Sequence, residues 1–364
     1  MGLSAIASAL FPSAASAPAV RRPAFDLQFG SASAKDWRQS VLAIRIESGL
    51  APFVDQAEVV VTATAHSPSA AVGDAGSISL GYQDSSTDKV FTGKVISVRR
   101  TLPGRTHIVA STGAAKLASM RLNRSYEQLS AGDILNDLIG TSGVNTDSTE
   151  DGVKYSFYVV DDRRNVWQHI ALLARKNDYL AWFSTEDKLN FKPFVAGQPV
   201  QTFNYGHDIL ALELTETLPV IGAVTSVGEG AAGSNGQDAW NWLAKDVSSL
   251  QAQSGAGDPA RLVSDGSLRS ADAASKAAEG IVSAAKRARV QGRILVPGAQ
   301  AINAGSTFAI AQAPQDSLNG TSLAKRVVHR YDKGTGFVSA IFFSNVGAGA
   351  GAGGGLLAAV GALL

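Results

Sequence analysis

Residues 155–191 read YSFYVVDDRRNVWQHIALLARKNDYLAWFSTEDKLNF, and this stretch decides the fold. Its first six residues predict a half-buried strand. Tyr155, Phe157 and Val159 would lie on one face, and Ser156, Tyr158 and Val160 on the other. Two carboxylates follow, Asp161 and Asp162, and are placed to cap a helix. The stretch therefore begins as a strand followed by a capped helix.

The predicted helix of this stretch is amphipathic. Its apolar positions are Val166, Ile170, Leu173 and Ala174. Basic residues in its last turn suit the negative end of the helix dipole, and Asn177 and Asp178 then turn the chain. Residues 179–183 and 189–191 form the arms of a hairpin around a polar turn. No residue of the unit points to catalysis.

Composition excludes several classes of protein. A chain of 364 residues exceeds what one core usually holds, which predicts two or three domains. A formal charge of +1 with 17% charged residues argues against binding nucleic acid through a broad basic field. The absence of cysteine excludes disulfides, thiolate nucleophiles and cysteine-based metal sites.

The two ends of the chain are rich in small residues. Residues 1–23 form an N-terminal extension that resembles a secretory signal only superficially, since no basic residue precedes its apolar part. Residues 346–364 are an apolar tail too rich in glycine for a membrane span, which needs about 20 mainly apolar residues. The tail is either flexible or docks on a partner. The docking residues would be Leu356, Leu357, Val360, Leu363 and Leu364.

Strand patterns dominate both halves of the chain. The first barrel is predicted over residues 24–115, with strands at 25–29, 41–47, 58–64, 78–82, 90–99 and 106–111. Gly104 is available for a positive-φ turn in its last hairpin. The second barrel is predicted over residues 201–345, with strands at 202–205, 209–215, 224–227, 290–295, 307–311, 323–331 and 336–344.

An α/β module, residues 116–200, separates the two barrels. Ser130 and Asp133 resemble a capping box, and the helix they start has one apolar face before Gly140 ends it. A helical excursion at about 239–290 interrupts the second barrel, with helices at 239–250 and 270–290 and a loop at 251–266 between them.

The tryptophan stripe of the first excursion helix is a candidate interface. Its residues are Trp240, Trp242 and Leu243. The stripe either packs on the second barrel or contacts another subunit or the tail tube.

The chemical candidates favour structural roles. None of the histidines, His66, His107, His169, His207 and His329, has the spacing of a metal site. We expect His169 to be a packing or interface residue and His329 to lie on a strand surface. The glycines from Gly228 imitate a phosphate loop but lack the strand-to-helix context. Carboxylate pairs such as Glu213 with Glu216, Glu127 with Asp133 and Glu150 with Asp151 are typical of solvated surface. The sequence predicts no catalytic, cofactor or metal site.

Four segments in a fixed order carry a resemblance to a known family. They are VFTGKV at 90–95, RLNRSY at 121–126, VWQHIALLA at 166–174 continuing to YLAWF at 179–183, and GRILVPG at 292–298 leading to VVHRY at 327–331. In this order the chain resembles the baseplate hub of contractile phage tails and injection systems: late control protein D and the hub portion of VgrG-type spike proteins.

The resemblance implies a fold class, a function and partners. The fold would be α+β and β-dominated, with two small tube-like antiparallel β-barrels, an inserted α/β module and a helical excursion. The protein would be a non-enzymatic homotrimer, a symmetry adapter joining the hexameric inner tube to the trimeric spike. Its partners would be the tail tube protein, the spike protein and other baseplate proteins, with tape measure or cargo in the lumen. It would assemble in the bacterial cytoplasm and reside in the baseplate, without a cofactor and without nucleic-acid sequence recognition.

The chain departs from VgrG-type proteins because no oligonucleotide-fold domain or β-helix follows its second barrel, so we expect the spike to be another chain. One alternative is a tail-associated cell-wall hydrolase acting through residues 116–193. Another is an unrelated secreted β-rich binding protein, which would require processing of the N-terminus.

Overall fold

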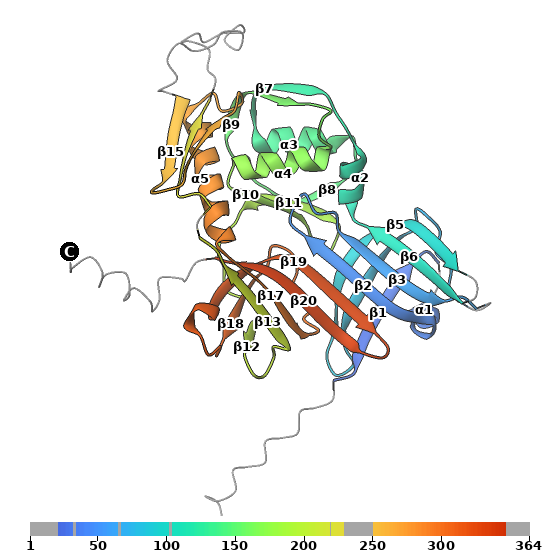
Figure 1. The fold of residues 1–364 in the computed structure, drawn as a ribbon. Helices are drawn as coiled ribbons and strands as arrows, with labels where there is room; N and C mark the ends of the chain where they lie inside the picture. Colours follow the sequence, from blue (N-terminus) through green and yellow to red (C-terminus); the bar gives the residue numbers. More distant parts are fainter. Residues whose placement is uncertain are drawn as a thin grey trace, which may run out of the picture.

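The fold is α+β with strands dominating, as predicted (Figure 1). The computed structural model describes residues 21–31, 34–64, 67–101, 104–218, 220–228 and 250–346. Its main element is a 12-stranded sheet that runs through both predicted barrels. Three smaller sheets and the longer helices form the rest of the molecule.

The first half of the main sheet corresponds to the first predicted barrel. In pairing order its strands are β1 (Pro23–Phe29), β4 (Ala75–Tyr82), β5 (Thr87–Thr101), β6 (Arg105–Ser111), β3 (Gln56–Thr62) and β2 (Val41–Gly49). Gly104 adopts φ +105° between β5 and β6, as expected of that turn. A short helix that the sequence did not predict, α1 (Ala34–Ser40), packs on β1 and buries Trp37 in this half's core.

The second half of the main sheet corresponds to the second predicted barrel. It contains β19 (Gly320–Asp332), β20 (Gly336–Asn345), β17 (Val290–Pro297) and β13 (Ala211–Glu216), with β18 (Thr307–Ala311) and β12 (Thr202–Asn204) branching from β19. A short 3-10 turn, η4 (Asp316–Leu318), lies between β18 and β19. The predicted hairpin loop between β19 and β20 is fixed by Asp332, whose carboxylate accepts hydrogen bonds from the Gly334 and Thr335 amides.

The two halves are joined by hydrogen-bonded pairing of β2 with β19. His329 lies opposite Ile46 and Arg326 opposite Gly49, so strands from the two ends of the chain are neighbours (Figure 1, blue beside red). Each half has a hydrophobic core, and Phe337 of β20 belongs to the core of the first half. The predicted barrels are therefore two halves of one sheet, with β1 and β13 at the ends of its main path and β12 at the end of the branch through β18.

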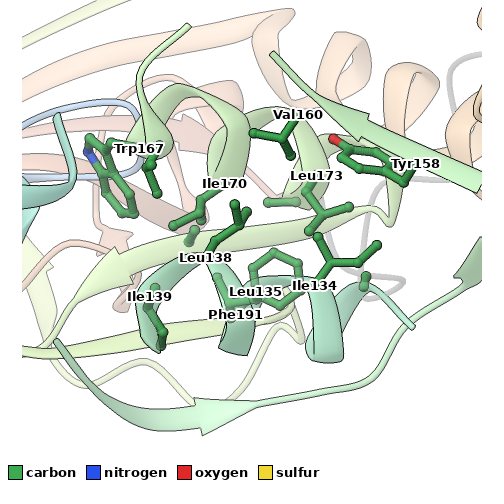
Figure 2. Close-up of a cluster of buried hydrophobic side chains, with 14 of the residues drawn as sticks. Ile134, Leu135, Leu138, Ile139, Tyr158, Val160, Trp167, Ile170, Leu173 and Phe191 are labelled. Atoms are coloured by element: carbon green, nitrogen blue, oxygen red, sulfur yellow. The ribbon is translucent and has the colours of Figure 1, made fainter. Parts of the chain in front are cut away.

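The α/β module packs its helices over a small mixed sheet. Its elements are α2 (Gly113–Ser119), β7 (Arg124–Ser130), α3 (Ala131–Gly140), β8 (Asn145–Thr149), β9 (Lys154–Val160), α4 (Val166–Lys176), β10 (Tyr179–Phe183) and β11 (Lys188–Pro193). Figure 2 shows Ile170 and Leu173 of α4 beside Leu135 and Leu138 of α3, with Phe191 of β11 in the same cluster. All five side chains are fully buried, which explains why this stretch of sequence is so dense in large apolar residues.

The caps of these helices are partly as predicted. Ser130 and Asp133 form the expected capping box of α3. The prediction that Asp161 or Asp162 caps α4 is wrong: Asn165 does so, in a reciprocal box with Gln168. The reason is that Asp161 instead accepts the Arg163 amide at 3.1 Å and forms a turn, so that the helix begins later.

Strand β9 does not alternate as regularly as predicted. Tyr155, Tyr158 and Val160 are buried, whereas 51% of Val159 is exposed. The ring centroids of Tyr155 and Tyr158 lie 5.2 Å apart. Strand β9 pairs with β7 alone, in a two-stranded ribbon, and both rings belong to the core of the module.

The excursion from the second half contains more strand than predicted. The predicted loop 251–266 contains β15 (Gln251–Gly255) and β16 (Ala260–Ser264), and both pair with β14 (Ala223–Val227). The prediction that residues 224–227 belong to the second barrel is therefore wrong. Polar alternating residues such as those of β15 give little periodic signal for a strand.

Helix α5 (Ala271–Ala288) confirms the predicted helix at 270–290 and packs on the module. A Cβ atom at Gly280 would lie 2.4 Å from the Arg175 carbonyl oxygen, so glycine permits the close approach of α5 to α4. Lys176 binds Asp265 at 2.7 Å and Ser267 at 2.8 Å, which fixes the turn before α5. The predicted helix at 239–250 lies outside the described residues.

Candidate interaction surfaces

Metal sites and membrane spans would each leave a structural signature. Within the described ranges, no group of three or more His, Cys, Asp or Glu side chains could hold a metal ion. Across the same ranges, no helix has the length and apolar character needed to cross a membrane.

The histidines take part in local contacts. His169 is buried, and its Nε2 atom lies 2.8 Å from the Asp161 carbonyl oxygen, which confirms it as a packing residue. His107 pairs with Glu58 at 2.9 Å, and the exposed His207 pairs with Asp208 at 2.7 Å. His66 lies outside the described residues.

The prediction that His329 lies on a strand surface is wrong. His329 is 1% exposed, and its Nδ1 atom lies 2.8 Å from the Ser339 hydroxyl. Burial lowers the pKa of His329 to about 4. The reason for the burial is that β19 lies between the two halves of the sheet, so that Val327, Val328 and His329 are covered on both faces.

The carboxylates named from the sequence have separate roles. Asp133 completes the capping box of α3, and Glu216 pairs with Arg289 at 3.1 Å. Glu150 and Asp151 are exposed next to β8. Of the residues imitating a phosphate loop, Gly228 is described and those after it lie outside the described ranges.

None of the interface residues proposed from the sequence is among the described residues. They are Trp240, Trp242 and Leu243 of the excursion and Leu356, Leu357, Val360, Leu363 and Leu364 of the tail. Their role as an interface stays a prediction.

Exposed apolar side chains lie at both ends of the edge strand β13. Residues 195–220 carry most of the exposed large apolar side chains: Val195, Val200, Tyr205, Leu210, Leu218 and Val220. Leu210 and Leu218, at either end of β13, are 59% and 87% exposed. An edge strand with exposed apolar flanks is typical of a surface covered by another subunit. The sequence held one signal for this surface, a run of apolar residues in a stretch otherwise rich in Gly, Pro and polar residues.

A second surface is a groove of about 920 Å³ between the module and the main sheet. Helices α4 and α5 and strand β10 form one wall, and α5 lies next to β17 and β20 (Figure 1). The outer faces of β13, β17, β20 and β19 form the other wall. Six of its lining residues are Arg or Lys. No pattern in the sequence indicates the groove, because these cations are spread from residue 164 to residue 326.

A buried carboxyl lies where the first half of the sheet meets the module. Asp55 is 3% exposed, and its carboxylate accepts the Gly49 amide at 2.9 Å. Burial, with a smaller contribution from Asp187, raises the pKa of Asp55 well above that of an ordinary carboxyl.

Replacing Asp55 with asparagine is expected to stabilise the fold at neutral pH. Because the pKa of Asp55 is raised in the folded state, the unfolded chain ionises at this residue first as pH rises. The folded protein therefore loses stability as pH rises above the ordinary carboxyl range. The asparagine side chain would keep an acceptor for the Gly49 amide and remove this loss. Thermal unfolding should give a higher Tm for Asp55→Asn at pH 7, with the gain shrinking in acid. The exposed Asp84→Asn is the control, and an equal gain there would contradict the argument.

Solved structures share this fold over nearly their whole length. A 43 kDa tail protein of prophage MuSo2 from Shewanella oneidensis matches with a TM-score of 0.68 and 13% identity, covering 89% of this chain and 98% of that one. A tail protein from Neisseria meningitidis MC58 matches with a TM-score of 0.67 and 12% identity, covering 90% and 98%.

A protein of a secretion system has the same architecture. The c3393 protein of E. coli, described as a component of the type VI secretion system similar in structure to the T4 phage tail proteins gp27 and gp5, matches with a TM-score of 0.59 and 10% identity. The match covers 88% of this chain and 76% of that one. At such identities the likeness shows a shared fold.

Comparison of sequences gives the family. No curated protein sequence matches the chain. The family model described as the Alg8 N-terminal domain matches residues 64–333 of the 364, well over half of the chain. The chain therefore belongs to the Alg8 N-terminal domain family.

Proposed function

We propose that this protein is a structural hub subunit of a contractile tail or injection particle. In this role it forms a homotrimer in the baseplate that joins a hexameric inner tube to a trimeric spike. The tail tube protein, the spike and other baseplate proteins are its partners, with tape measure or cargo in the lumen. It is assembled in the bacterial cytoplasm. The proposal includes the relation to late control protein D and to the hub portion of VgrG-type proteins, and the division into two tube-like units with an inserted module.

One observation supports the proposal: the main path of a single sheet runs through two halves, each with a hydrophobic core, and ends in two different edge strands, β1 and β13. Unlike edges support a head-to-tail contact, in which one surface of a subunit meets another surface of the next and a ring can close. Three subunits with two halves each would present six similar units to a hexameric tube. The fold shared with phage tail proteins supports this placement.

Negative-stain microscopy and light scattering of the purified protein test the proposal. We expect a trimer and rings with threefold symmetry. A uniform monomer at micromolar concentration would count decisively against the hub.

Charges at the ends of β13 are expected to break the trimer while leaving the subunit folded. Burying one leucine side chain is worth about 1.5–3 kcal/mol, so Leu210→Glu with Leu218→Glu should weaken trimer formation at least about tenfold. Light scattering across a dilution series measures the change, and circular dichroism checks the fold. Leu262→Glu, on β16 and also exposed, is the matched control. Loss of the trimer in the control, or its survival in the double variant, would contradict β13 as the contact.

A further inference from the structure

A β-bulge brings two neighbouring cations to one side of the main sheet. In the pairing of β19 with β20, Ala324 lies opposite Phe343 and Arg326 lies opposite Phe342, so Lys325 is an extra residue. Successive residues of a regular strand point to opposite faces, but Lys325 and Arg326 both line the groove. Bulges of this kind redirect side chains and are common next to functional sites.

The groove contains more positive charge than the described residues neutralise. Its cations are Arg164, Arg175, Arg287, Arg293, Lys325 and Arg326. Two of them have acidic partners, since Arg287 pairs with Asp178 at 3.4 Å and Arg326 pairs with Glu47. Among the described residues, no carboxylate lies within ion-pair distance of the other four.

Lys325 is the clearest case of an uncompensated charge. It is half-buried, and its ammonium group donates to the neutral side chain of Gln291 at 3.1 Å. Burial lowers the pKa of Lys325, and the nearby Arg287 guanidinium lowers it further. An anion at this position would relieve the repulsion between the two cations.

An aromatic floor orders the guanidinium groups. The Arg293 and Arg326 guanidinium carbons lie 5.7 Å and 5.3 Å from the Phe342 ring centroid. Arg326 also lies 4.9 Å from the Phe53 ring centroid. Cation–π contacts limit the freedom of these long side chains, so less entropy is lost when they bind a carboxylate.

The chemistry of the groove favours a peptide over a nucleic acid. The cations are local, because the whole chain carries a formal charge of only +1 and provides no broad basic field. Asp178 and Glu213 also line the groove and would repel a continuous row of phosphates, while they can accept backbone amides of a peptide. Apolar residues such as Leu172 and Leu180 line the groove as well. A volume of about 920 Å³ is at the upper end of ordinary ligand sites.

We propose that the groove binds an extended segment of a second protein in which acidic residues alternate with apolar ones. Glutamate or aspartate side chains would bind Arg293, Lys325 and Arg175, and the apolar residues would pack on Phe342 and Leu180. The groove includes part of β13, but the residues proposed to bind the peptide lie on other elements, so the proposal does not depend on the trimer.

Fluorescence anisotropy with the full-length chain tests the proposal. The probe is a short labelled peptide in which glutamate alternates with leucine. Three comparison probes are a peptide with lysine for glutamate, a peptide with serine for leucine, and a single-stranded oligothymidylate. We expect the Glu–Leu peptide to bind most tightly, the Glu–Ser peptide more weakly and the Lys–Leu peptide not at all.

Substitutions in the groove should abolish this order. The double variant Arg293→Gln with Lys325→Gln is expected to bind the Glu–Leu peptide at least about tenfold more weakly, because charge-assisted hydrogen bonds are lost. The matched control is Arg99→Gln with Arg100→Gln, which removes two exposed arginines from β5, outside the groove, and should leave affinity unchanged. Circular dichroism of both variants checks that the fold is intact.

Several results would overturn the proposal. Equal affinity of the groove variant and the native chain would show that the peptide binds elsewhere. If the oligothymidylate bound more tightly than the Glu–Leu peptide, and the groove variant lost this binding, the ligand of the groove would be a nucleic acid. Loss of self-association in the groove variant would make the occupant a second copy of this chain. If the native chain were a monomer and still bound the Glu–Leu peptide in the groove, the hub proposal would be wrong and the peptide site would stand.

Discussion

Replacing Trp167 with alanine is expected to reduce the free energy of unfolding by about 3–5 kcal/mol, the usual range for a buried tryptophan. Trp167 is 1% exposed, and its ring centroid lies 5.4 Å from that of Phe183 in an edge-to-face contact. Its indole Nε1–H donates to the Phe53 carbonyl oxygen at 2.8 Å. The substitution therefore opens a cavity in the module and leaves a carbonyl group of the loop after β2 without its partner.

Denaturant unfolding measures this effect, and two further variants separate its parts. Trp167→Phe keeps a ring in the core but removes the donor, so we expect a smaller loss of about 1–3 kcal/mol. Val159→Ala, at a position 51% exposed on β9, is the control and should stay within about 0.5 kcal/mol of the native chain. If Trp167→Ala had the same denaturant midpoint of unfolding as the native chain, the core of the module would not depend on this residue.

Acid is expected to destabilise the protein through His329 by about 3 kcal/mol between pH 6.5 and pH 4. The folded-state pKa of His329 is lowered from 6.5 to about 4 because the ring is buried. As pH falls, the unfolded chain therefore takes up the proton first, and stability is lost until the folded ring is protonated as well. Above pH 6.5 this contribution to stability is fully present.

The free energy of unfolding as a function of pH checks this prediction. His329→Gln should flatten the curve between pH 6.5 and pH 4, although it also alters the contact with Ser339 and lowers stability at neutral pH. His207→Gln changes an exposed ring and should keep the native profile. An unchanged acid slope in His329→Gln would refute the role of His329. Asp55 acts in the opposite direction over an overlapping pH range, since it lowers stability as pH rises. The two contributions are separated by comparing His329→Gln and Asp55→Asn with the native chain.

Local patterns predicted the elements of this fold well. The strands of both halves and helices α3, α4 and α5 follow from apolar periodicity, because these elements bury one face. The cap of α4 was misplaced because Asp161, Asp162 and Asn165 are all good caps, and only the path of the preceding turn decides between them. Helix α1 was missed because one tryptophan, Trp37, makes most of its buried contact.

Features that depend on distant residues could not be predicted. The pairing of β2 with β19 leaves no local signal, so the sequence suggested separate barrels and placed His329 on a surface. The groove joins side chains from several elements, and the bulge at Lys325 is visible only in the register of two strands. The edge at β13 was recognisable only once its pairing on one side was known.

The join between β2 and β19 has a consequence for synthesis. Glu47 and Arg326, which pair across this join, are 279 residues apart in the chain. At a translation rate of about 5–20 residues per second, β2 leaves the ribosome tens of seconds before its partner exists. During that time the edge of β2 is unpaired, and it carries apolar residues such as Ile44 and Ile46 that are buried in the folded protein. Such an edge can pair with strands of other chains. We therefore expect a product truncated before β19 to aggregate more readily than the full-length chain.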